Sequence, residues 1–203
     1  CQRSKYAARI DGYARTVAVV REVGTTASHM ALDHRRDRLF IADAGSNALI
    51  CVTASDLKHL ERWDMPGSPH LPLVTEEGIA CTTISAAAAL SIVWPHHGGY
   101  RAKVIEVGSG PHDPVVTPDG QSILVPCAGA GEVVRVGLSD GRITGRYTVG
   151  DGPAHIAVHP DGTRIYVANT FDGTLACISA EGDLLCQVTS GRWAHVPAVI
   201  PDG

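Results

Sequence analysis

The sequence lacks the features that mark several common classes of partner. Its formal net charge is −4 and it has no long run of acidic or basic residues, so it offers no electrostatic surface for nucleic acid or a polybasic membrane contact. Its longest apolar stretch, "IACTTISAAAALSIVW", is interrupted by threonine and serine and is shorter than the roughly 20 residues of a spanning helix. We therefore expect no nucleic-acid partner and no membrane span.

Several enzyme motifs are also missing. The six cysteines include no C-x-x-C pair, which leaves a zinc knuckle or a thioredoxin-type motif without support. No G-x-S-x-G, P-loop or dinucleotide-binding sequence occurs, so a hydrolase triad or nucleotide chemistry has no basis either. Helix signals are almost absent. The compartment in which the protein acts stays open.

What the chain has instead is a repeat centred on histidine. Five segments share the pattern His-x-[Ala/Pro]-apolar, and their spacings are 41, 42, 43 and 40 residues. The segments are "HMAL", "HLPL", "HDPV", "HIAV" and "HVPA", which begin at His29, His70, His112, His155 and His195. This period is close to that of a four-stranded propeller blade. Runs such as "RIYVAN" and "TLACIS", separated by Asp-Gly turns, predict short antiparallel strands.

The segments "RIYVANTFDGTLACI" and "GPAHIAVHPDG" resemble the YVTN family of β-propeller repeats, and the resemblance extends over nearly all of the chain. It implies a β-propeller, a fold that hosts many functions and specifies none of them.

We therefore predict an all-β fold, a single β-propeller domain over residues 1–203 with four-stranded blades. The repeats lie near residues 25–67, 68–109, 110–151 and 152–191, and a fifth blade is split between residues 192–203 and 1–24. Sharing one blade between the two ends closes the ring and removes free sheet edges. The alternative is a truncated propeller of six to eight blades.

The repeated histidines all lie near the start of an inner strand. Inner strands run beside the propeller axis, so equivalent imidazoles are expected to point toward a common centre. Pro72, Pro114 and Pro197 each follow a histidine by two residues. Because proline cannot donate to a strand ladder, we predict a bulge downstream of the histidine in these repeats.

Converging neutral imidazoles are good ligands for transition metals. The predicted ligands are His29, His70, His112, His155 and His195. No carboxylate or thiolate repeats with them, so copper is the first choice, iron the second and zinc the third. Asp113 is a candidate acceptor for a metal-bound imidazole, although strand alternation should turn its side chain away from that of His112.

Two other sets of side chains have simpler interpretations. Cys127 aligns with Asp43 and Asn169 in other repeats. It is either a thiolate near the metal or, as is more usual, a buried inert cysteine. The three tryptophans are expected to fill gaps between blades, and they are Trp63, Trp94 and Trp193.

The functional hypothesis is a copper- or iron-dependent oxidoreductase acting on a small-molecule substrate, with a zinc hydrolase or lyase as a variant. A protein partner is compatible with either. The alternative is a non-catalytic scaffold or binding module, in which the ring of histidines serves stability or metal carriage. A third reading is a fragment of a larger haem- or sugar-binding propeller.

Overall fold

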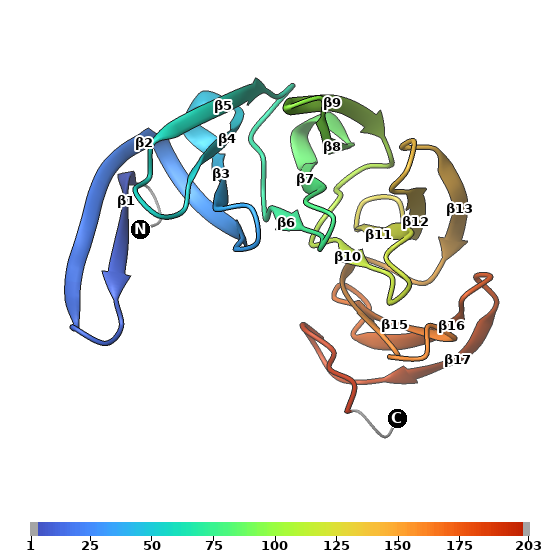
Figure 1. The fold of residues 1–203 in the computed structure, drawn as a ribbon. Coiled ribbons are helices and arrows are strands. Elements are labelled where there is room, and N and C mark those ends of the chain that lie inside the picture. The colour runs from blue at the N-terminus through green and yellow to red at the C-terminus, as the bar shows by residue number, and fades with distance from the viewer. Residues whose placement is uncertain (1–3, 201–203) are drawn as a thin grey trace. The chain divides into compact units, whose positions relative to one another are not determined.

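The computed structural model describes residues 4–200 as four antiparallel sheets joined in chain order (Figure 1). Sheet 1 has five strands, β1 (Ser4–Asp11), β2 (Thr16–Asp33), β3 (Arg38–Asp43), β4 (Ala48–Thr53) and β5 (His59–Asp64). Sheet 2 has β6 (Leu73–Val74), β7 (Ala80–Ile84), β8 (Ala89–His96) and β9 (Gly99–Glu106).

Sheets 3 and 4 repeat the four-stranded plan. Sheet 3 contains β10 (Val115–Val116), β11 (Ser122–Cys127), β12 (Glu132–Gly137) and β13 (Ile143–Thr148). Sheet 4 contains β14 (Pro153–Val158), β15 (Arg164–Asn169), β16 (Thr174–Ser179) and β17 (Leu184–Thr189). The predicted all-β architecture of four-stranded units is confirmed. The described helices are two single 3-10 turns, η1 (Ala44–Ser46) and η2 (Ser85–Ala87), and no described helix has the length and apolar character needed to cross a bilayer.

The turns that join β3 to β4, β7 to β8, β11 to β12 and β15 to β16 use the same backbone conformation. Asn47, Ala88, Gly131 and Gly173 all have a positive φ, between 50° and 69°. This left-handed conformation favours glycine, which has no Cβ to be strained, and asparagine, whose short polar side chain can form local hydrogen bonds. At Gly173 a Cβ would also lie 2.8 Å from the carbonyl oxygen of Gly191, so only glycine fits the turn before β16.

The chain forms two compact units. Unit 1 contains the residues up to Ala86 together with Ser91–Val104, and unit 2 contains Ala87–Leu90 together with the residues from Ile105 onward. In unit 1, Phe40 of sheet 1 contacts Trp63 in a stacked arrangement and Tyr100 of sheet 2 edge-on, with ring centroids 6.3 and 5.9 Å away. Trp63 therefore fills the space between two blades, as predicted.

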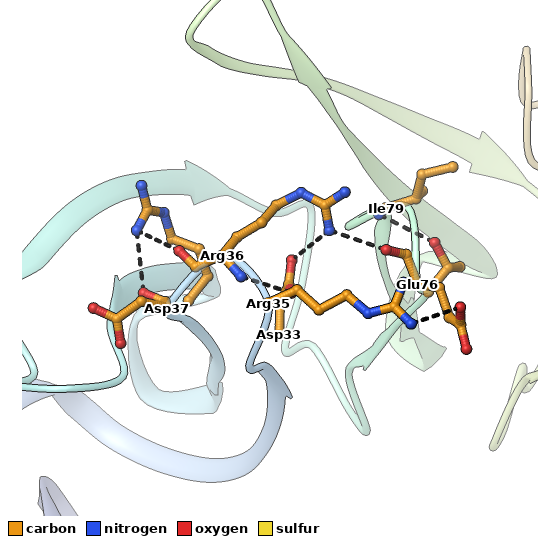
Figure 2. Close-up of polar contacts among 8 residues, drawn as sticks. Asp33, Arg35, Arg36, Asp37, Glu76 and Ile79 are labelled. Carbon is orange, nitrogen blue, oxygen red and sulfur yellow. Dashed lines mark hydrogen bonds and ion pairs between the residues drawn. The ribbon is translucent and has the colours of Figure 1, made fainter.

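Polar contacts of two arginines also join the first two sheets in unit 1 (Figure 2). The Arg36 guanidinium donates through Nη1 to Oδ2 of Asp33 and to the carbonyl oxygen of Glu76, both at 3.0 Å. Arg35 Nη2 lies 3.0 Å from the Glu76 carboxylate. Because Asp33 is buried, its charge depends on Arg36 for compensation.

In unit 2 the apolar faces of sheets 3 and 4 form one core. Leu124, Val133 and Tyr147 of sheet 3 pack with side chains of sheet 4 that include Val167 and Ile178. Burying each aliphatic side chain of this size contributes about 1.5–3 kcal/mol. The core holds the two inner strands of this unit at a fixed separation.

The strand pairing assigns residues 4–24 to a different sheet from the one expected of a split fifth blade. Residues 4–24 form β1 and the first half of β2, and this hairpin belongs to sheet 1 because β2 continues unbroken into the inner strand. The hairpin buries Ala7 and Val23 against Ile41 and Ile50 of that sheet. Residues 190–200 contain no strand, and residues 1–3 and 201–203 lie outside the described part. The count of five blades and the closure of the ring stay predictions.

Candidate functional site

The strand register puts His29 and His155 at equivalent places in their sheets. His29 pairs with Ala42 of β3 and His155 pairs with Ala168 of β15, in each case one residue before the buried end of the partner strand. Each ladder has a register shift just upstream of the histidine. The two imidazoles are therefore presented by the same local backbone.

His70 and His112 occupy the equivalent position in sheets 2 and 3, but with a different hydrogen-bond pattern after the histidine. Their N–H groups donate to the carbonyl oxygens of Thr83 and Pro126, at 2.9 and 2.8 Å. Regular pairing resumes at Leu73 with Cys81 and at Val115 with Leu124. In both sheets two inner-strand residues then oppose one residue of the partner strand, which is a bulge. The bulge predicted after the histidine is confirmed in these two repeats.

In unit 2 two of the predicted histidines lie beside one carboxylate, and a third contacts one of these two histidines. The Nδ1 atom of His155 lies 3.4 Å from Oδ2 of Asp113, and the Nδ1 atom of His112 lies 3.5 Å from Oδ1 of the same residue. The Nε2 atoms of His155 and His195 are 3.0 Å apart. One ligand atom from each of His112, Asp113 and His155 lies within 4.8 Å of the others.

The position of Asp113 corrects an expectation from the sequence. Strand alternation predicts that its side chain turns away from His112, but the bulge before Val115 breaks the alternation. The carboxylate is thereby brought between His112 and His155. Sequence reasoning underestimated Asp113 as a member of this site. Pro114, which predicts the bulge, was the signal that could have indicated its direction.

The electrostatics of the group follow from its contacts. His155 is 7% exposed, whereas His195 is exposed. With Nδ1 facing a carboxylate and Nε2 facing another imidazole nitrogen, the His155 ring is arranged to keep its proton on Nδ1 and a lone pair on Nε2. Two Nε2 atoms at this distance share one proton, or both donate a lone pair to a bound cation.

The other two predicted ligands form a pair in unit 1. The rings of His29 and His70 have centroids 4.8 Å apart and are inclined by 58°. The structure thus brings the five predicted ligands together in two groups, each within one unit. Their common convergence on a single ion stays a prediction.

A pocket of about 360 Å³ lies next to His195 in the chain. Its lining is Thr170, Phe171, Asp172, Gly173, Arg192 and Trp193. The Thr170 hydroxyl donates to the carbonyl oxygen of Ala194 at 2.9 Å, which fixes the segment leading into His195. Trp193 is 73% exposed and does not fill a gap between described blades, so the expectation for this tryptophan is wrong.

The residues that align with Cys127 serve the backbone rather than a metal. Burial raises the pKa of the Cys127 thiol to about 12, so it is not a thiolate at neutral pH. Asp43 accepts hydrogen bonds from the backbone N–H groups of Thr25 and Thr26 at 2.9 and 2.6 Å. Asn169 donates to the carbonyl oxygen of Val149 at 2.9 Å.

Comparison with known proteins decides the family. Residues 79–189, more than half of the chain, match the family model described as "Lactonase, 7-bladed beta-propeller". The chain belongs to this lactonase-type propeller family. No curated protein matches it.

Solved propellers confirm the fold of this lactonase-type chain. It superposes on the dihydro-heme d1 dehydrogenase NirN, in complex with DHE, with a TM-score of 0.77 and 15% identity, covering 93% of this chain and 43% of that one. A functionally unknown protein from Desulfotomaculum acetoxidans gives 0.72 and 14%, covering 90% and 62%. A protein from Lactobacillus plantarum gives 0.68 and 18%, covering 93% and 63%. The chain thus spans 43% to 63% of the length of these structures.

Proposed function

We propose that this lactonase-type propeller is a metal-dependent oxidoreductase that holds a transition-metal ion on its repeated imidazoles. The observation that supports this most is the Nε2 pair of His155 and His195, 3.0 Å apart, with the Asp113 carboxylate behind His155. A carboxylate behind a ligand imidazole fixes its tautomer and raises its basicity. The YVTN type of the repeat stays a prediction.

The donor set fits such an ion. With bonds of about 2.1 Å to imidazole nitrogen, neighbouring ligand atoms lie about 3.0–3.4 Å apart. The separation of the two Nε2 atoms falls in this range. His112 stands beside them, with its ring centroid 5.2 Å from that of His155, as the third imidazole of the group. Nitrogen donors favour copper, then iron, with zinc as the third choice.

Each residue then has a definite task. Asp113 accepts the Nδ1 proton of His155 and leaves Nε2 as the donor atom. His195 supplies the exposed side of the site, where a substrate has access. The neighbouring pocket offers the Arg192 guanidinium for an anionic group of the substrate and the rings of Phe171 and Trp193 for a flat group. When bound, copper or iron supplies one-electron or dioxygen chemistry.

Metal analysis of the full chain tests the proposal. After loading with copper(II) or iron(II) and removal of excess, we expect about one ion per chain. His155→Ala combined with His195→Ala should abolish retention, whereas His159→Ala is the matched control, because His159 lies in a turn 2.7 Å from Asp161. Asp113→Asn should weaken binding by about 10- to 100-fold, as expected for a residue that orients a ligand.

The activity assay separates the enzyme classes. Dioxygen consumption by the loaded protein with an added reductant supports the oxidoreductase, and hydrolysis of a simple lactone by the zinc form supports the hydrolytic variant, in which the ion activates water. Protein that retains no ion and shows an unchanged melting curve with copper or iron overturns the metal proposal and leaves the non-catalytic scaffold.

A second candidate is a binding module for a metal-containing tetrapyrrole. It is favoured by the pocket of Phe171, Arg192 and Trp193, since two exposed rings and a guanidinium suit a flat ligand with carboxylates, and by the likeness to NirN, which is seen in complex with DHE. Titration with haemin should give a shifted Soret band that Trp193→Ala removes. Haemin binding that is insensitive to Trp193→Ala would contradict this candidate.

A further inference from the structure

Sheet 4 places two cysteines directly opposite each other. Cys177 of β16 pairs with Cys186 of β17 in the antiparallel register. Directly opposed residues have side chains on the same face of the sheet, with Cβ atoms about 4.5–5.5 Å apart. Their Cα separation of about 4.5–5.5 Å lies within the range that a disulfide spans.

The two thiols differ in access. Cys177 is 8% exposed and Cys186 is exposed. Burial, and then the neighbouring Cys186, raises the pKa of the Cys177 thiol. Ala176 and Ile178, which flank Cys177, point into the core with sheet 3, so by alternation both thiols lie on the opposite face.

Other described cysteines have no such partner in the strand pairing. Cys51 pairs with Phe40 and Glu61, Cys81 pairs with Leu73, and Cys127 pairs with Glu132. Each of these three thiols is buried, and burial raises the pKa of each. They serve as internal controls for any reaction at sheet 4.

We propose that Cys177 and Cys186 form a reversible cross-strand disulfide by exchange with a low-molecular-weight disulfide such as oxidised glutathione. The Cys186 thiolate attacks one glutathione sulfur, the glutathione S–S bond breaks, and one glutathione leaves as a thiolate. Cys177, after losing its proton, attacks Sγ of Cys186 and releases the second glutathione. The two protein thiols lose two electrons and two protons, and oxidised glutathione becomes two thiols.

The sequence allows the bond to be located without ambiguity. Trypsin should release both cysteines in one peptide, because no lysine or arginine lies between Arg164 and Arg192. Glutamate-specific cleavage after Glu181 then separates them. After equilibration of the full chain in glutathione buffer, acid quenching and alkylation, we expect the tryptic peptide to be lighter by two hydrogens and unalkylated. After the second cleavage its two pieces should stay joined until reduced.

Two variants show whether the link depends on Cys177 and Cys186. Cys177→Ser should accumulate a glutathione adduct on Cys186, which is exposed and has room for the adduct. Cys51→Ala is the matched control and should retain the link. A persistent adduct on Cys186 in the unchanged protein, a link from Cys186 to any other cysteine or to a second chain, or full alkylation of both thiols in the oxidising buffer would overturn the proposal. The proposed disulfide is independent of the metal site, so the metal content of the protein does not decide the outcome of this test.

Discussion

Asp43→Ala removes the hydrogen-bond acceptor of the β2 backbone just before the register shift at His29. The Asp43 carboxylate is buried and accepts from the backbone N–H groups of Thr25 and Thr26 and from the hydroxyls of Thr25 and Ser46. The hydroxyls can turn to other acceptors, but the two N–H groups cannot. Each hydrogen bond to a charged group is worth about 1.5–3 kcal/mol, so for the two N–H groups we expect a loss of about 3–6 kcal/mol in the free energy of unfolding.

The same contacts give this loss a pH dependence. Burial alone would raise the pKa of Asp43, but the hydrogen bonds from Ser46 and from Thr25 and Thr26 outweigh it and hold the pKa below its ordinary value of 3.8. A carboxyl group with a lowered pKa in the folded state stabilises the protein above the unfolded pKa, and this stabilisation is lost as the pH falls through the folded pKa. The cost of Asp43→Ala should therefore shrink in acid.

Urea unfolding at pH 7 and at about pH 3 measures both effects. Asp64→Ala is the control, since Asp64 is an exposed residue paired with Arg62 at 3.0 Å, and exposed ion pairs contribute about 0–1 kcal/mol. A loss below about 1 kcal/mol at pH 7, or one that is the same at both pH values, would refute the assignment of this carboxylate as the anchor of β2.

Three further predictions concern packing, ion pairing and a turn. Phe40→Ala should cost about 3–5 kcal/mol in urea unfolding, because its fully buried ring is replaced by a cavity between two sheets; a loss near 1 kcal/mol would show that the site collapses. Arg36→Ala should cost about 1–3 kcal/mol, because it leaves the buried Asp33 carboxylate without its cation, and equal stability would show that water replaces the guanidinium. Gly173→Ala should lower the melting temperature more than Gly120→Ala. Both have a φ of +69°, but at Gly120 a Cβ would meet nothing within 4 Å, so equal shifts would contradict the steric argument.

The candidate site shows where sequence reasoning fails. Period and composition placed a histidine at the same point of each repeat, and the strand register agrees for His29, His70, His112 and His155. Alternation then predicted the wrong direction for Asp113, because a bulge inserts one residue and reverses the facing of the side chain before it. Proline at 114 signalled a bulge, but not which groups it would bring together.

The sequence by itself determined the all-β repeat, the turns and the equivalent positions of His29, His70, His112 and His155 in their repeats, since these depend on the two-residue period and on residues close in the chain. Only the tertiary structure decided which side chains meet. The pairing of β1 with β2 and the opposition of Cys177 and Cys186 depend on the register of neighbouring strands, and the approach of Asp113 to His155 depends on packing between segments distant in sequence. Local preferences do not specify those contacts, because a shift of one residue presents the opposite face of a strand.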